Sequence, residues 1–128
     1  NTNVSVYLVG GILRHKENCL GGPIARSVIR QYHFDKFFLG AAGISENSGL
    51  PDFGMDEVET KRAFIERSKE VIVLTDSSKF GKVSFVNICK FSDVTHIITD
   101  WDIDPKMKNT LIKKGVNFII VTCNENLV

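Results

Sequence analysis

An apolar run that ends abruptly in polar residues is the feature that most constrains this sequence. Residues Val71-Ile72-Val73-Leu74-Thr75 are followed at once by Asp76-Ser77-Ser78-Lys79-Phe80-Gly81. A short run this rich in β-branched residues predicts a strand that is buried on both faces, as in the parallel sheets of α/β proteins. Ligands of such sheets bind beyond the carboxyl ends of the strands. Lys79 is therefore expected where an anionic ligand would bind.

Strand-like and helix-like segments alternate along the rest of the chain, which is typical of βαβ units. Strands are expected at residues 4–9, 36–39, 71–75, 95–99 and 117–121. Helices are expected from residue 23 to about 33, after residue 55, and between residues 104 and 115. Residues 40–52 are expected to form a loop, and 82–94 a short irregular helix, because the apolar residues of 82–94 fit neither period. The sequence predicts an α/β fold with a mostly parallel sheet flanked by helices.

Signals at the helix ends support these three helices. Pro23 suits a first helical turn, and the residues after it form one apolar stripe: Ile24, Val28, Ile29 and Tyr32. Glu57 and Glu59 are expected in the first turn of the second helix, where the helix dipole favours acidic residues. The inner face of that helix is expected at Met55, Val58 and Ile65. Asp104 as N-cap, with Pro105 after it, and Gly115 beyond the end bracket the third helix.

Size and charge restrict the class of protein. A chain of 128 residues with 43% hydrophobic content fits one domain that can bury a core. The 16 basic and 15 acidic residues give a net charge of +1, without the basic cluster that marks nucleic-acid-binding proteins. Strong DNA binding by this chain alone is not expected. No apolar stretch approaches the roughly 20 residues that span a bilayer, and no signal peptide opens the chain, so a cytoplasmic protein without membrane partners is expected.

The cysteines and histidines show no ligand spacing. Cys19, Cys89 and Cys123 are odd in number and far apart, which favours three reduced thiols over a disulfide framework or a zinc site. His15, His33 and His96 likewise lack the spacing of a metal-binding helix. Neither a metal nor another cofactor is predicted.

Five segments, taken together and in order, resemble one known family. They are Leu8-Val9-Gly10-Gly11, Asp35-Lys36-Phe37-Phe38-Leu39-Gly40-Ala41-Ala42-Gly43-Ile44, Glu57-Val58-Glu59-Thr60-Lys61-Arg62-Ala63-Phe64-Ile65, Asp76-Ser77-Ser78-Lys79-Phe80-Gly81 and Ile97-Ile98-Thr99-Asp100. Nearly the whole chain resembles the C-terminal sensor domain of DeoR-type bacterial repressors of sugar metabolism, such as those of lactose and fructose phosphotransferase systems. The resemblance implies a fold related to ribose-5-phosphate isomerase, glucosamine-6-phosphate deaminase and CoA transferases.

The same resemblance implies a function. Proteins of this kind bind a phosphorylated sugar as inducer, and an N-terminal helix-turn-helix domain, absent from these residues, binds the operator. The candidates for the sugar are fructose, tagatose, galactitol and deoxyribose phosphates. Repressors of this kind act as symmetric oligomers, so a homo-oligomer is expected.

The start of the chain suggests a fragment. It opens on Asn1 and reaches the first expected strand within three residues. The family pattern has an earlier strand that ends in a Gly-Thr-Thr type loop, thought to hold the ligand phosphate. Residues 1–128 are therefore expected to be a truncated sensor domain that lacks this loop.

The residues that remain can still bind an anion. Lys79 supplies an ammonium group, and Ser77, Ser78 and backbone N–H groups near Gly81 can complete a shell around phosphate oxygens. Asp76 has two equally weighted roles, either accepting ligand hydroxyls or satisfying backbone donors in the turn.

Two further segments are candidates for ligand contact. Gly40, Ala41 and Gly43 offer a backbone that a ligand can approach closely, although a tight turn explains them equally well. Glu57 and Lys61 are spaced as a helical ion pair, which is the simpler explanation unless both face the cleft. Related isomerases carry Glu and Lys at a comparable helix start, which keeps both residues, and Glu59, as candidates.

An isomerase or deaminase is the alternative, since relatives of this fold move a proton beside a carbonyl. The deaminases have a Gly-x-Asp-Gly-His type loop where this chain has Gly40-Ala41-Ala42-Gly43-Ile44, and Ala and Ile cannot exchange protons. Glu46, Glu57 and Glu59 are the remaining bases. The sequence favours a sensor without catalytic residues over an enzyme. A purely structural oligomerisation module is the third class, but it has no need for the Asp76–Lys79 segment.

Overall fold

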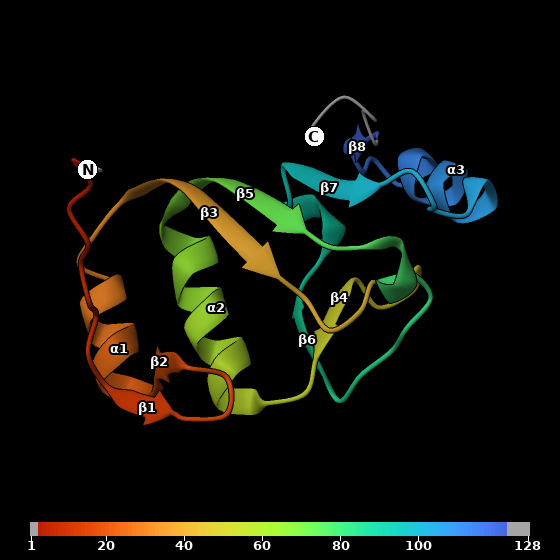
Figure 1. Ribbon diagram of the computed structural model, residues 1–128. Helices are drawn as coiled ribbons and strands as arrows, with labels where there is room; N and C mark the ends of the chain where they lie inside the picture. Colours follow the sequence, from red (N-terminus) through yellow and green to blue (C-terminus); the bar gives the residue numbers. More distant parts are fainter. Residues whose placement is uncertain (1–2, 123–128) are drawn as a thin grey trace, which may run out of the picture.

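A parallel sheet of four strands forms the centre of the molecule (Figure 1). The computed structural model describes residues 3–122. The strands, in their spatial order, are β3 (Phe34–Gly40), β5 (Ser68–Leu74), β7 (His96–Asp100) and β8 (Phe118–Val121). Every neighbouring pair is parallel. The predicted α/β fold with a mostly parallel sheet is confirmed, and so are the strands expected near 36–39, 71–75, 95–99 and 117–121.

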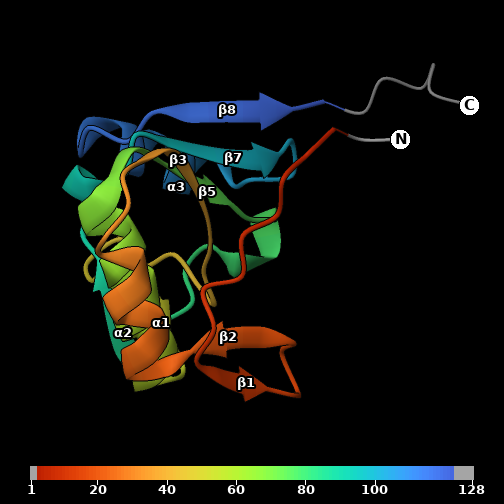
Figure 2. The same cartoon turned by 90° about the vertical axis from the view of Figure 1, so that its left-hand side faces the viewer.

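The helices lie on one side of the sheet. α2 (Met55–Arg67) and α3 (Pro105–Lys113) bring Val58 and Leu111 into the core, where they join Leu39, Val73 and Ile97 of the sheet. α1 (Gly22–Ile29) packs mainly against α2 (Figure 2). The core therefore lies between the sheet and the layer formed by α2 and α3.

The ends of α3 follow the sequence prediction. Asp104 is the N-cap, and its carboxylate accepts a hydrogen bond from the backbone N–H of Met107 at 2.9 Å. This bond satisfies one of the N–H groups that have no partner within the helix. Gly115 adopts φ +88° just beyond the helix, a conformation that glycine takes without strain.

Two small antiparallel ribbons complete the fold. β1 (Ile12–Arg14) pairs with β2 (Cys19–Gly21), and β4 (Leu50–Asp52) pairs with β6 (Val86–Cys89). Two 3₁₀ turns, Ser77–Lys79 and Phe91–Asp93, follow β5 and β6. The expected loop at 40–52 thus ends in a strand. The irregular helix expected at 82–94 is wrong for 86–89, which form a strand because they pair with a segment distant in the sequence.

The strand expected at residues 4–9 is also wrong, since these residues pair with no strand of the described chain. Four of their apolar side chains are exposed, namely Val4, Val6, Tyr7 and Leu8. The helix expected to reach about residue 33 ends at Ile29. The apolar stripe expected along this helix is confirmed only in part. Ile29 is buried, together with Ala25, whereas Ile24 and Tyr32 are exposed.

The acidic residues in the first turn of α2 are Asp56 and Glu57, so Glu57 was expected there correctly and Glu59 wrongly. Among residues 3–122, no helix is long and apolar enough to cross a membrane.

Candidate functional site

The loops that follow β3 and β5 meet at the carboxyl edge of the sheet. The backbone N–H of Ile44 donates to the carbonyl oxygen of Lys79 at 2.9 Å, and the N–H of Gly81 donates to the carbonyl oxygen of Ile44 at 2.8 Å. We call these two segments, residues 40–44 and 75–81, the strand-end loops. The expected glycine segment and the expected lysine segment are therefore held side by side.

Gly43 is required for this close approach. A Cβ atom at Gly43 would lie 2.6 Å from the carbonyl oxygen of Lys82, which is backbone and cannot move aside cheaply. Gly40 differs, because a Cβ atom there would have no neighbour within 4 Å. The tight turn expected as one explanation thus applies to Gly43, whereas the open space needed for ligand approach is found at Gly40.

Asp76 organises the second of these loops. Its carboxylate accepts a hydrogen bond from the N–H of Ser78 at 2.9 Å and caps the Ser77–Lys79 turn. Hydrogen bonding to Ser78 lowers the pKa of the Asp76 carboxyl. Of the two roles weighed for Asp76, this structure shows the satisfaction of backbone donors.

Asp100, which follows the strand expected at residues 95–99, connects the loop after β5 to the end of β7. Its carboxylate accepts hydrogen bonds from the N–H of Ser77 at 2.7 Å and from the N–H of Asp102 at 2.9 Å. The bond from Ser77 is the main reason that the pKa of Asp100 is lowered. The sequence offered one signal for this role, a carboxylate directly after an expected parallel strand. The two N–H groups that bond to Asp100 are known only from the fold.

Lys79 is half-buried, and its backbone is fixed by the turn. Its N–H donates to the carbonyl oxygen of Asp76 at 3.1 Å. Within residues 3–122 the Lys79 amine forms no hydrogen bond or ion pair. The ammonium group therefore retains its donors for a ligand while the backbone beneath it is held in place.

Glu57 and Lys61 belong to a chain of charges that joins three elements. The Lys61 amine contacts Glu57 Oε1 at 2.7 Å and also pairs with Asp52 Oδ2 of β4. Arg14 of β1 contacts the other oxygen of Glu57, Oε2, at 3.3 Å. The side chains of Lys61 and Asp52 are only 18% and 6% exposed. The helical ion pair expected from the spacing exists, but Arg14 and Asp52 enlarge it, and neither could be found from local sequence because both partners come from short ribbons.

Arg14, Glu57 and Lys61 of this chain of charges border a cavity of about 210 Å³ beneath the β1–β2 hairpin. We call it the hairpin cavity, and it is lined by Arg14, Cys19, Leu20, Gly21, Phe37, Phe38, Gly40, Asp56, Glu57, Thr60, Lys61 and Phe64. Gly40 also opens the first strand-end loop. Of the predicted site residues, Gly40, Glu57 and Lys61 line the hairpin cavity, whereas Ala41, Gly43 and the Asp76–Lys79 segment belong to the strand-end loops and do not line it.

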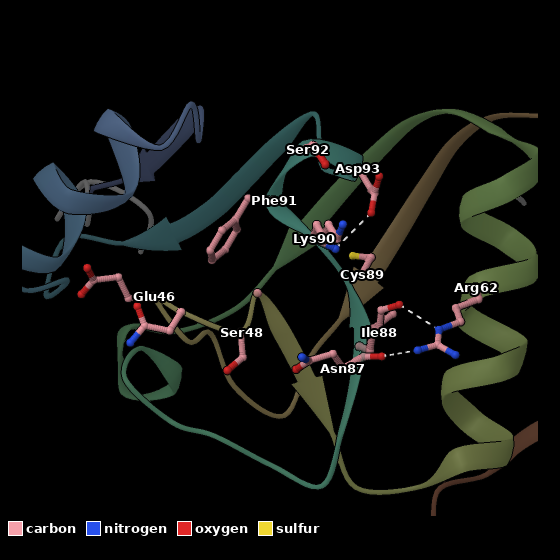
Figure 3. A pocket seen from close by; sticks show the side chains of 12 residues that line it. Glu46, Ser48, Arg62, Asn87, Ile88, Cys89, Lys90, Phe91, Ser92 and Asp93 are labelled. Atoms are coloured by element: carbon pink, nitrogen blue, oxygen red, sulfur yellow. Dashed lines mark hydrogen bonds between the residues drawn. The ribbon is translucent and has the colours of Figure 1, made fainter.

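A larger hollow, of about 720 Å³, lies elsewhere, between β6, the Phe91–Asp93 turn and the turn near Glu46 (Figure 3). Arg62 of α2 points into it but is held by the backbone of β6, donating to the carbonyl oxygens of Ile88 at 3.0 Å and Asn87 at 2.7 Å. Glu46 is the only residue named above as a candidate base that lines it. Arg62 thus fixes β6 to α2, and none of the predicted ligand-contact residues lines the hollow.

Comparisons with known proteins agree with this arrangement. A family model described as "DeoR C terminal sensor domain" matches residues 1–101. The chain is 36% identical over 123 residues to the uncharacterized HTH-type transcriptional regulator YulB of Bacillus subtilis, with 96% of this chain and 48% of that protein covered. It is 32% identical over 114 residues to the HTH-type transcriptional regulator GlpR of Haloferax volcanii, with 89% and 45% covered.

A third relative is the glycerol-3-phosphate regulon repressor of Escherichia coli, which is 38% identical over 95 residues. This match covers 74% of the chain and 38% of the relative. The chain thus spans less than half the length of these relatives.

Proposed function

The chain belongs to the DeoR C-terminal sensor domain family, and from that premise we propose that it is the effector-binding part of a transcriptional repressor. Its relatives are transcriptional regulators, so the chain is a regulatory domain and not an isomerase or deaminase. The effector we propose is a phosphorylated sugar or a related small phosphate ester.

The observation that carries this proposal is the pair of hydrogen bonds between the strand-end loops. They hold the Lys79 turn against the glycine segment at the carboxyl edge of a parallel sheet, where ligands of such folds bind. An ammonium group on a turn that is bonded to the glycine segment suits a phosphate, since the charge can act together with the close approach that the uncrowded Gly40 backbone allows. Ser77 and Ser78 supply hydroxyls on the same turn.

The hairpin cavity is the proposed position of the uncharged part of the effector. Glu57 and Lys61 present a carboxylate and an amine that can bind sugar hydroxyls, and Gly40 connects this cavity to the strand-end loops. The name of the Escherichia coli relative refers to glycerol 3-phosphate, a small phosphate ester of the size that such a site can hold.

The proposed mechanism is a population shift. The effector binds one arrangement of the repressor better than the other, and that arrangement keeps the DNA-binding domains out of register with the operator. Coupling of about 1 to 3 kcal/mol, or roughly 5- to 150-fold in operator affinity, is typical of such linkage. We propose that a helix-turn-helix domain outside residues 1–128 binds the operator, that the repressor is a homo-oligomer, and that it acts in the cytoplasm.

The test is the operator affinity of the full-length repressor, measured by fluorescence anisotropy with and without each effector. The panel contains the phosphates of fructose, tagatose, galactitol and deoxyribose, and glycerol 3-phosphate. We expect one phosphate ester to lower operator affinity by about 5-fold or more, and its unphosphorylated parent to have no effect. Unchanged affinity with every member of the panel, or conversion of any member to a product, would refute the proposal.

A further inference from the structure

The cationic side chains that line the hairpin cavity already have carboxylate partners. The Arg14 guanidinium contacts Glu57 Oε2 at 3.3 Å and Glu17 Oε2 at 3.5 Å. The Lys61 amine contacts Glu57 Oε1 at 2.7 Å and also pairs with Asp52. Two cations and three carboxylates make up this chain of charges, so its sum is −1. Neither cation is free to neutralise an anionic ligand.

Asp56 adds a further negative charge to the border of the cavity. It lies in the first turn of α2, next to Glu57, and lines the hairpin cavity. Its backbone carbonyl oxygen accepts a hydrogen bond from the Thr60 hydroxyl at 2.9 Å, but within residues 3–122 its carboxylate forms no hydrogen bond or ion pair. His15 and Lys16 lie in the turn of the hairpin and do not line the cavity. The excess charge at the border is therefore negative.

The strand-end loops have the opposite character. In the part of the chain that the structure describes, the Lys79 amine has no hydrogen-bond or ion-pair partner, so its charge remains available to an anion. The first of these loops begins at Gly40, which also lines the hairpin cavity. The two parts of the proposed site thus differ in the charge that they can accept.

Apolar side chains form much of the remaining wall of the hairpin cavity. Phe37 of β3 and Phe64 of α2 line it and stack with their ring centroids 4.9 Å apart, and Leu20 lines it from the hairpin. Walls of this kind, with a few polar groups between them, are typical of small-molecule sites. A second phosphate in this cavity would lose its hydration against apolar walls without gaining a free cation, which is unfavourable.

We propose that the hairpin cavity selects effectors by charge, and that Asp56 is the residue that sets this selection. The cavity accepts the end of a sugar monophosphate that is uncharged or carries an amine, because hydroxyl or ammonium donors can bond to Asp56 and Glu57. It rejects a second phosphate or a carboxylate at that end, so sugar bisphosphates and phosphorylated sugar acids are excluded. This inference rests on the proposed function for its ligand, but the charge of the cavity can be measured without any effector.

Cys19, which lines the hairpin cavity, is a native probe of this charge. Its rate of modification is measured in the full-length repressor with a cationic and an anionic methanethiosulfonate of similar size, by mass spectrometry of the peptide that carries it. The ratio of the two rates is divided by the same ratio for free cysteine, which removes the intrinsic reactivities of the reagents. Low salt leaves the charges unscreened, since the Debye length is about 30 Å at an ionic strength of about 0.01 M.

In the wild type we expect the corrected ratio to favour the cationic reagent about tenfold or more. Asp56→Asn should reduce this preference about threefold or more, and Asp56→Lys should reduce it further. Asp102→Asn is the matched control, because Asp102 is exposed and does not line the hairpin cavity, and it should leave the ratio unchanged. No preference in the wild type, or equal ratios in the wild type and Asp56→Asn, would overturn the proposal.

Two ligands that differ by one phosphate separate this inference from the proposed function. In calorimetry of the full-length repressor, we expect fructose 1,6-bisphosphate to bind about tenfold or more weakly than fructose 1-phosphate, and Asp56→Asn to narrow this gap. A bisphosphate that binds as tightly as the monophosphate would overturn the inference. If the thiol preference is present but no sugar phosphate binds, the charge selection by the cavity is supported and the proposed function is refuted.

Discussion

The backbone N–H of Ile44 donates to the carbonyl oxygen of Lys79 at 2.9 Å, which joins the loop after β3 to the loop after β5. The position of the Lys79 amine thus depends on the conformation of a glycine segment that is distant in the sequence. Because Gly43 allows the close approach and Gly40 faces open space, these two glycines have different roles at the site.

A pair of alanine substitutions separates these roles. Gly43→Ala would place a methyl group 2.6 Å from the carbonyl oxygen of Lys82, and the backbone shift that relieves this clash is expected to cost about 1–3 kcal/mol of unfolding free energy. Gly40→Ala meets no atom within 4 Å and should leave stability nearly unchanged while weakening effector binding. Urea denaturation and calorimetry measure the two effects. Equal loss of stability in both variants would contradict the assignment.

Sequence patterns were sufficient for the parallel strands and for α3, because each has a continuous apolar signal or a cap that acts locally. The run 71–75 and the Asp104 cap are examples. For α2, which has no side-chain cap, the signals were its acidic first turn and Val58, whereas Met55, expected on the inner face, is 54% exposed.

Sequence patterns failed where the structure depends on pairing between strands that are distant in the sequence. Residues 86–89 form a strand only because β4 lies beside them, and residues 4–9 have strand character without a partner in the described chain.

The candidate site likewise has a part that the sequence predicted and a part that it did not. The Asp76–Lys79 segment and the glycine loop were recognisable from local residue types and from family resemblance, although their role in binding remains a prediction. The partners of Glu57 and Lys61 were not recognisable. Arg14 and Asp52 come from β1 and β4, and neither short strand was predicted.

Lys61 is expected to stabilise the fold as well as the site. Lys61→Met would leave Asp52, only 5% exposed, without its cationic partner. We expect a loss of about 2 kcal/mol in the free energy of unfolding, less than the roughly 3–5 kcal/mol of a fully buried pair because Lys61 retains some solvent contact. Lys69→Met is the matched control, since Lys69 and its partner Asp35 are 76% and 85% exposed and their pair should contribute nothing measurable. Equal denaturation midpoints of the two variants would show that the Asp52 pair is not a stabilising contact.

Acid is expected to weaken the contact between the loop after β5 and the end of β7. Hydrogen bonds from Ser77 lower the pKa of Asp100 below its ordinary value of 3.8. A carboxyl with a lowered folded-state pKa contributes stability above its ordinary pKa and loses it as the pH falls through the folded value. Asp100→Asn should therefore be less stable than the wild type at pH 7, with the difference shrinking below pH 3.8. A difference in unfolding free energy that is constant with pH would contradict this role.

Cys89 is expected to resist alkylation in the folded protein. Burial, with a smaller contribution from Asp93, raises the pKa of its thiol to about 12, so the reactive thiolate is scarce at pH 8. Iodoacetamide labelling followed by peptide mass spectrometry should find Cys89 unmodified in the native state and modified in urea. Cys19, which lines the hairpin cavity, should react in the native protein and be protected by the effector. Labelling of Cys89 at the same rate with and without urea would contradict the raised pKa of its thiol.

The most direct test of the central claim is calorimetric titration of the full-length repressor with its phosphorylated effector, comparing the wild type with Lys79→Gln. Lys106→Gln, on the exposed surface of α3, is the control for a lost positive charge. If the Lys79 amine binds the phosphate, removing this charge-assisted hydrogen bond should weaken binding by about 1.5–3 kcal/mol, while Lys106→Gln binds like the wild type. Unchanged affinity in Lys79→Gln, or equal binding of the unphosphorylated sugar by the wild type, would contradict the account.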